Sequence, residues 1–204
     1  FPEISLSVLT KDPKDIARPK DEPTLLYNAM IHPIKQFTIK GTIWYQGESN
    51  LNNPQVYKRL FPAMVRSWRK EWNQGEFPFY YVQIAPYDYG RKNADKTEAA
   101  EIRQVQLECL KEIPNAGMVV TADIGNRTCV HPSDKERVGK RLALWALAKT
   151  YQRSGTPYSG PLYKSFTIDK EKIIVEFDYA EMGMTSYDRE IVGFEIAGKD
   201  GIYY

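Results

Sequence analysis

The stretch TIKGTIWYQGESN, residues 38–50, predicts a buried strand that runs directly into a cluster of polar groups. Its first part is rich in β-branched and aromatic residues, which favour a pleated and partly buried surface: Ile39, Thr42, Ile43, Trp44 and Tyr45. α/β Enzymes place functional groups at the carboxyl ends of parallel strands. The polar end of this stretch therefore predicts a site, although a loop that merely caps the strand fits the spacing equally well.

Strands and helices alternate over the middle of the chain. Buried strands are predicted over residues 77–85 and 117–122, with a helix beginning near Pro54 and another over about residues 96–113. This order is typical of parallel crossover units. The sequence thus predicts an α/β fold with a parallel sheet.

The helix that begins near Pro54 has an apolar residue at every fourth position, which predicts its packing face: Val56, Leu60, Met64 and Trp68. Pro62 should kink or locally break this helix. A later helix should reach about Gln152, with Ser133 as N-cap because Ser133 and Glu136 fit the capping box.

After a Ser-Gly-Thr-Pro turn at residues 154–157 the pattern changes to short strands, predicted over 163–168, 172–177 and 191–196. We therefore predict an α/β domain over residues 1–153 and the start of a β region over 154–204. Within the first domain, the proline-rich residues 1–23 are expected to form an extended linker or covering segment.

Composition excludes several functional classes. The chain has 204 residues and a net charge of +2 without long runs of either sign, which argues against a nucleic-acid-binding arm or a polybasic membrane anchor. No segment is apolar enough to span a bilayer, and no spacing of His, Cys and Asp indicates a metal site. Cys109 and Cys129 could pair or stay free. Because the chain begins with Phe1 and shows no signal peptide, we expect a piece of a longer protein.

Two motifs resemble one known family. WYQGESN, residues 44–50, resembles the third conserved block of the sialate O-acetylesterase branch of the SGNH hydrolases, and VHPSDKERVGKRLALWA, residues 130–146, is similar to the His-Pro block of that family. Weaker matches follow the expected order at residues 26–34, 103–108 and 160–166. The resemblance implies a three-layer, SGNH-hydrolase-like α/β fold, incomplete at its N-terminus in this chain, followed by a partial β-sandwich-like region.

The same resemblance implies a serine-type carbohydrate esterase that removes O-acetyl groups from sialic acid or a related acetylated sugar, without metal or cofactor. The implied location is secreted or periplasmic. The expected partners are the acetylated carbohydrate and the upstream half of the same protein. Two alternatives stay open: an acetylxylan-type esterase, whose branch shares both motifs, and a non-catalytic carbohydrate-binding fragment.

His131 is the catalytic base that the resemblance implies. It follows the predicted strand 117–122 and precedes a predicted helix. The chain has only one other histidine, His32, which is expected to be a packed or surface residue in a short helix.

This chain departs from the family pattern at the position of the acid that would orient His131. Many family members carry an aspartate two or three residues before this histidine, where this chain has Cys129 and Thr128. Glu48 is the preferred substitute because it leaves the end of the neighbouring strand. Three weaker alternatives remain: a backbone carbonyl, Asp123 and Asp134.

Donors for the oxyanion of the reaction are implied in the first motif, at Gln46 and the N–H of Gly47, with the amide of Asn50 as an alternative. Arg103, in the 103–108 match, could contact the sugar but is expected rather to bind a loop.

The nucleophile is missing, because no block like the family's GQSN motif is present. Ser49 does not replace it, since a nucleophile elbow would require glycine at position 51.

Overall fold

The computed structural model describes residues 24–89, 97–181, 183–184, 188, 190–191 and 193–202. The linker or covering segment predicted for residues 1–23 lies outside the described residues. The chain divides into two units, Phe1–Thr156 and Pro157–Tyr204.

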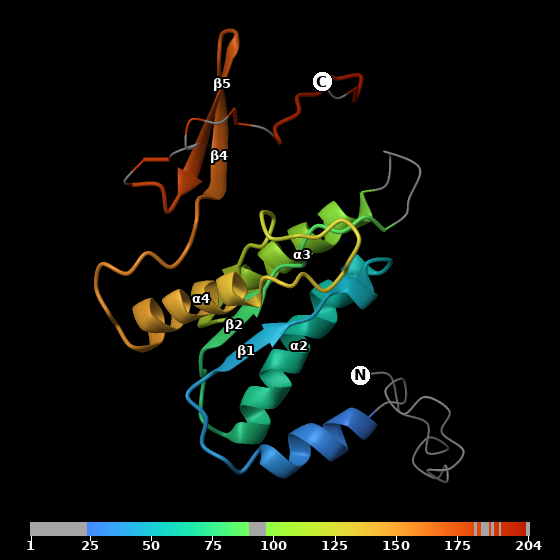
Figure 1. Ribbon diagram of the computed structural model, residues 1–204, viewed down its shortest axis with the longest axis vertical. Coiled ribbons are helices and arrows are strands. Elements are labelled where there is room, and N and C mark those ends of the chain that lie inside the picture. Colours follow the sequence, from blue (N-terminus) through green and yellow to red (C-terminus); the bar gives the residue numbers. More distant parts are fainter. Residues whose placement is uncertain are drawn as a thin grey trace. The chain divides into compact units, whose positions relative to one another are not determined.

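A parallel sheet forms the centre of the first unit (Figure 1). In the described residues it has three strands in the order β1 (Thr42–Tyr45), β2 (Phe79–Val82) and β3 (Ala116–Val119). The register aligns Tyr45 with Val82 and Val82 with Val119. The three carboxyl ends therefore lie at one edge of the sheet. The predicted α/β fold with a parallel sheet is confirmed.

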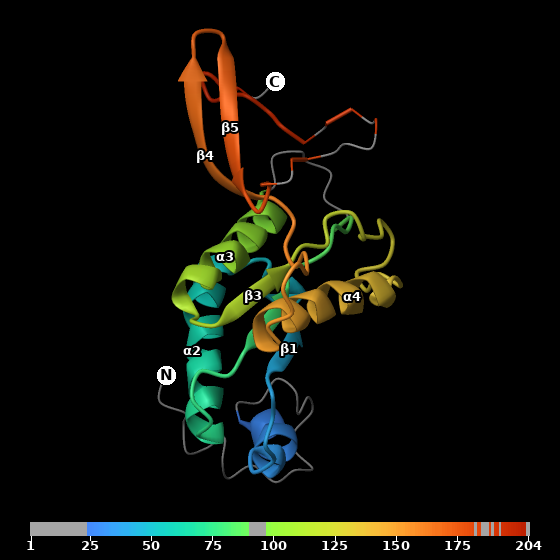
Figure 2. The ribbon, with the colours of Figure 1, turned by 90° about the vertical axis from the view of Figure 1, so that its left-hand side faces the viewer.

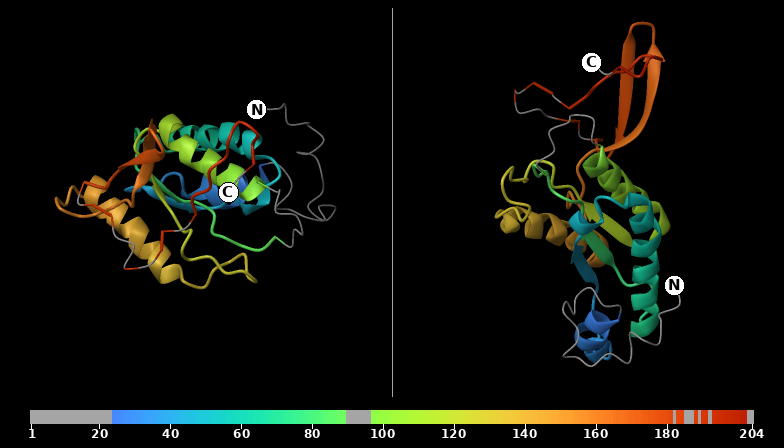
Figure 3. Two further views of the ribbon diagram at one scale, coloured as in Figure 1. Left: turned by 90° about the horizontal axis from the view of Figure 1, so that it is seen from above. Right: turned by 90° about the vertical axis from the view of Figure 1, so that its right-hand side faces the viewer.

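Helices cover both faces of this sheet, as Figures 2 and 3 show. One face is covered by α2 (Pro54–Trp72) and α3 (Glu98–Glu112), and the other face is covered by α4 (Lys135–Trp145). A π-helical turn, Ala146–Thr150, extends α4 toward the predicted end near residue 152.

Side chains of β2 alternate between the two helical layers, as a strand requires. The ring of Phe61 on α2 contacts Phe79 and Tyr81, with centroids 5.9 and 4.9 Å apart. On the opposite face Tyr80 contacts Trp145 of α4 at 5.9 Å. β2 is thus buried on both faces, which explains its run of aromatic residues.

The packing face of α2 is displaced by one residue from the predicted face. The apolar residues that enter the core are Tyr57, Phe61, Val65 and Trp72. Of the predicted face, Met64 and Trp68 are partly buried and pack against the core, whereas Val56 and Leu60 are 38% and 50% exposed. The two stripes are adjacent on the helix, and burying the one that contains Tyr57 and Phe61 removes more apolar surface from water.

Two other expectations about helices are corrected. Pro62 does not break α2, because the helix continues through it and the proline is buried in the core. The N-cap of α4 is Asp134 instead of Ser133, and its carboxylate accepts the N–H of Arg137 at 3.0 Å. An aspartate caps well at this position because it also carries a negative charge at the positive end of the helix dipole.

The second unit contains the strands predicted over residues 163–168 and 172–177, as β4 (Leu162–Asp169) and β5 (Lys172–Asp178), and these two pair as an antiparallel hairpin. The strand predicted over residues 191–196 is not formed in its described part, 191 and 193–196. Gly193 has a φ of +95° there, which interrupts an extended conformation. That this unit begins a β-sandwich stays a prediction.

Candidate active site

The polar residues after β1 form a compact turn at the carboxyl edge of the sheet. Glu48–Asn50 make a 3₁₀ turn, closed by the N–H of Asn50 on the carbonyl of Gly47 at 2.9 Å. The Nε2 of Gln46 donates to Oδ1 of Asn50 at 2.7 Å. Because the Asn50 oxygen accepts this bond, its NH₂ group remains as the donor. The structure thus brings together the two side-chain amides that the sequence identified.

A buried glutamine on α3 holds this turn in place. Gln106 has no solvent exposure, and its Oε1 accepts the N–H of Ile84 at 2.9 Å. Its Nε2 donates to the carbonyls of Gln46 at 3.3 Å and Val82 at 3.4 Å. Gln106 therefore joins the ends of β1 and β2. Sequence reasoning missed it, although a glutamine within the apolar stripe of a helix could have indicated it.

Gly47 is close to this glutamine. A Cβ atom at Gly47 would lie 2.9 Å from Nε2 of Gln106 and 2.7 Å from Cγ2 of Ile84. The absent side chain at Gly47 therefore allows the amide to reach the carbonyl of Gln46.

Replacing Gln106 with leucine should lower the free energy of unfolding by about 2–3 kcal/mol, because buried backbone groups of Gln46 and Ile84 lose their partners. Urea unfolding followed by circular dichroism measures this loss. Gln104→Leu is the matched control, since Gln104 is exposed on the same helix and bonds Glu108. Equal stabilities of the two variants would contradict the role of Gln106.

His131 lies in the loop between β3 and α4, with an exposed side chain next to the buried Pro132. Oδ1 of Asn126 accepts the N–H groups of Thr128 at 2.8 Å and Cys129 at 3.0 Å. Both cysteines are free, and the thiol of Cys129 donates to the carbonyl of His131 at 3.2 Å. The loop thus fixes the backbone on both sides of the imidazole.

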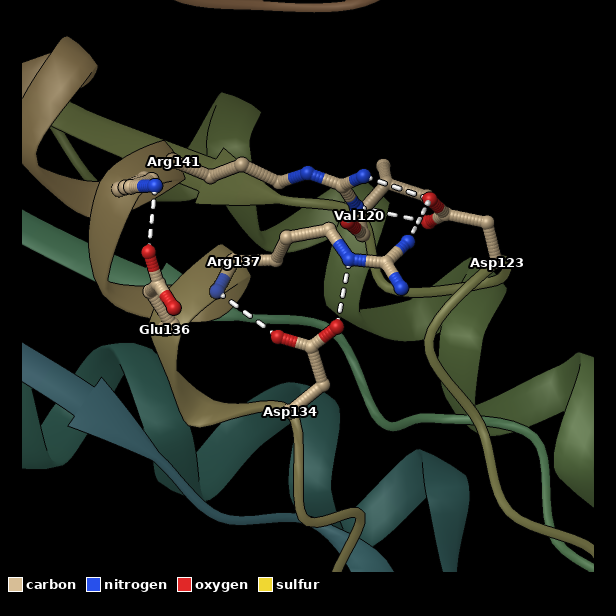
Figure 4. Close-up of polar contacts among 7 residues, drawn as sticks. Val120, Asp123, Asp134, Glu136, Arg137 and Arg141 are labelled. Atoms are coloured by element: carbon tan, nitrogen blue, oxygen red, sulfur yellow. Dashed lines mark hydrogen bonds and ion pairs between the residues drawn. The ribbon is translucent and has the colours of Figure 1, made fainter.

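The two aspartates near His131 are engaged by arginines of α4 (Figure 4). The carboxylate of Asp123 accepts bonds of 2.7 and 2.6 Å from Arg141, and Asp134 accepts a bond of 2.5 Å from Nε of Arg137. The Arg141 guanidinium lowers the pKa of Asp123, and the backbone N–H of Arg137 lowers the pKa of Asp134. By contrast, the carboxylate of Glu48 accepts no hydrogen bond or ion pair within the described residues.

A cation–π contact links the His131 loop to the end of β1. Nζ of Lys135, four residues after His131, lies 4.8 Å from the centroid of the Tyr45 ring. The pKa of Tyr45 is raised, first by burial and second by the negative charge of Glu48. Within the described residues Glu48 and His131 make no bond to each other, but Tyr45 adjoins both their segments. Tyr45 and Lys135 are 90 residues apart in the chain, and no sequence pattern identifies them as a pair.

Arg103 is half-buried, and its Nε donates to the carbonyl of Ile84 at 3.3 Å. Burial lowers the pKa of its guanidinium. This contact fits the expected loop-binding role, and contact with a sugar stays a prediction.

A depression lies beside these loops, lined by Pro86, Tyr87, Asp88, Gly125 and Arg127. Nε of Arg127 bonds the carboxylate of Asp88 at 3.2 Å, which joins the loops after β2 and β3. The loop after β2 is described only as far as Tyr89.

The described part of the chain contains neither a cluster of metal-ligating residues nor a membrane-spanning helix. No group of three or more His, Cys, Asp or Glu residues there could hold a metal ion. None of the helices described is long and apolar enough to cross a bilayer.

Comparison with known proteins gives consistent results. Residues 12–148 match the family model of carbohydrate esterases described as sialic acid-specific acetylesterases. The chain is 33% identical to the sialate O-acetylesterases of rat, over 76% of this chain and 32% of the relative, and of human, over 82% and 35%. It thus spans about a third of the length of these curated relatives.

A solved structure resembles the fold. The crystal structure of a carbohydrate acetylesterase from Xanthomonas citri superimposes with a TM-score of 0.81 and 38% sequence identity, over 89% of this chain and 42% of that protein. The family match covers all three strands of the parallel sheet, and together with this structural likeness it establishes the relationship. The chain belongs to the sialic acid-specific acetylesterase family of carbohydrate esterases.

Proposed function

We propose that the protein to which this chain belongs is a serine-type carbohydrate esterase of SGNH type, which removes O-acetyl groups from sialic acid or a related acetylated sugar. The observation that carries the proposal is the placement of the Gln46–Asn50 turn and the His131 loop at one edge of a parallel sheet. Secretion or a periplasmic location is part of the same proposal and rests on the family resemblance.

In the proposed mechanism the nucleophilic serine comes from a segment outside this chain. His131 accepts the proton of that serine as it attacks the acetyl carbonyl, and later returns a proton to the sugar oxygen that leaves. The amides of Gln46 and Asn50 and the N–H of Gly47 donate to the oxyanion. Water then hydrolyses the acetyl-serine with His131 again as base.

The test measures acetate release from an O-acetylated sialic acid and from acetylated xylan. Two samples are compared: the 204-residue chain and the protein extended to include the upstream segment. We expect no turnover by the chain, and hydrolysis of the sialic acid ester by the longer protein with a kcat/KM at least about tenfold above that for xylan.

Each other outcome selects one alternative. A preference for xylan would favour an acetylxylan-type esterase, and sugar binding by the longer protein without hydrolysis would favour a carbohydrate-binding role. Turnover by the chain itself would place the nucleophile inside it and contradict the proposed division of the site.

A further inference from the structure

Arg141 makes three contacts with the segment that begins the His131 loop. Its two terminal nitrogens bond the two carboxylate oxygens of Asp123 at 2.7 and 2.6 Å, and NH1 also donates to the carbonyl of Val120 at 2.6 Å. Val120 directly follows β3. A planar guanidinium suits this bidentate arrangement, and a lysine could not reproduce it.

Arg137 connects the beginning of the same loop with its end. Its NH1 lies 3.5 Å from the carboxylate of Asp123, while its Nε and backbone N–H bond Asp134, the N-cap of α4 (Figure 4). His131 lies three residues before Asp134. Both ends of the loop that carries the imidazole are therefore fixed to α4.

We propose that Arg141 and Asp123 form a positioning pair that holds the His131 loop in the geometry required for proton transfer. Neither residue touches the imidazole, so the pair acts through the loop backbone. The side chain of Arg141 is 32% exposed and that of Asp123 54% exposed, so the pair should contribute little to global stability. Its main effect is on the placement of His131, and this catalytic consequence depends on the function proposed above.

The first experiment uses the 204-residue chain and needs no catalysis. Amide hydrogen exchange is measured at Thr128 and Cys129, whose N–H groups bond Asn126 inside the loop. In Arg141→Met we expect exchange at these two amides to accelerate about tenfold, while amides of β2 keep their rates.

Lys140→Met is the matched control. Lys140 is the neighbouring cation on α4 and pairs with Glu136 at 2.5 Å, away from the loop. It should leave loop exchange unchanged. Arg141→Lys provides a second variant that keeps the charge and most of the packing, and it should lie between wild type and Arg141→Met.

The second experiment measures kinetics on the longer, serine-containing protein. Arg141→Met should lower kcat about tenfold or more with KM nearly unchanged, because a small displacement of a catalytic group mainly affects the chemical step. The same loss in Asp123→Asn, without a further loss in the double variant, would support the pair.

The outcomes separate the two proposals. Wild-type exchange rates at Thr128 and Cys129 in both Arg141 variants would overturn the positioning role, as would an unchanged kcat in an active enzyme. A uniform acceleration over all amides would also overturn it, since it would show a general loss of stability. An inactive wild-type protein would contradict the proposed function, whereas faster local exchange in Arg141→Met would still establish that the pair holds the loop.

Discussion

Replacing His131 with alanine should lower kcat for acetyl-ester hydrolysis by about four orders of magnitude in the protein that includes the serine-bearing segment. The serine hydroxyl is a weak nucleophile unless a base accepts its proton. The resemblance to the family's His-Pro block assigns the role of base to His131, whose side chain is exposed in the loop between β3 and α4. Steady-state kinetics with an O-acetylated sialic acid measure the effect.

His32→Ala is the control for this prediction. His32 is the only other histidine of the chain, and it is exposed, with its ring 6.1 Å from that of Tyr27. Its replacement should leave kcat unchanged. Because the His131 side chain is also exposed, both variants should unfold within about 0.5 kcal/mol of wild type. Retention of more than about a tenth of the wild-type kcat in His131→Ala would contradict its assignment as base.

The parallel sheet could be predicted because its signals are local. β1 and β2 are short runs of β-branched and aromatic residues, and β3 leads into Val119, Val120 and Thr121. Each strand is separated from the next by a helix, which a crossover connection accommodates. The error in α2 shows the limit of such signals. Two apolar stripes lie side by side on this helix, and only the tertiary packing of Phe61 against Phe79 and Tyr81 decides which one is buried.

The candidate site was predictable to the extent that it is continuous in sequence. Gln46 and Asn50 lie four residues apart, and one short turn is enough to join their amides. Gln106 is 60 residues from Gln46 in the chain, and its role depends on how α3 crosses the sheet. The same holds for Tyr45 with Lys135 and for Asp123 with Arg141, whose contacts exist only after α4 has packed.

The structure also refines the choice among the acids that could orient His131. Asp123 and Asp134 are both bonded to arginines, so turning either toward the imidazole would break those contacts. Glu48 has no such partner among the described residues. Its negative charge contributes to the raised pKa of Tyr45, and the ring of Tyr45 contacts Lys135 of α4. Glu48 therefore remains the preferred orienting acid, with a backbone carbonyl as the alternative.

Glu48→Gln should lower kcat by about 10²–10⁴-fold and change KM by less than about threefold. A carboxylate can only accept a hydrogen bond, so it selects the imidazole tautomer whose other nitrogen is free to take the proton of serine. A glutamine amide can also donate, and a donated bond would hold the ring in the wrong tautomer. Substrate binding does not depend on that choice, which explains why KM should change little.

Glu48→Ala tests this explanation, because alanine removes the carboxylate without offering a competing donor. If the wrong tautomer is the cause, Glu48→Ala should retain a higher kcat than Glu48→Gln. Glu112→Gln, at the exposed end of α3, makes the same chemical change away from the site and should have wild-type kinetics. An unchanged kcat in both Glu48 variants would remove Glu48 from the mechanism and leave a Ser–His dyad whose imidazole is held by a backbone carbonyl.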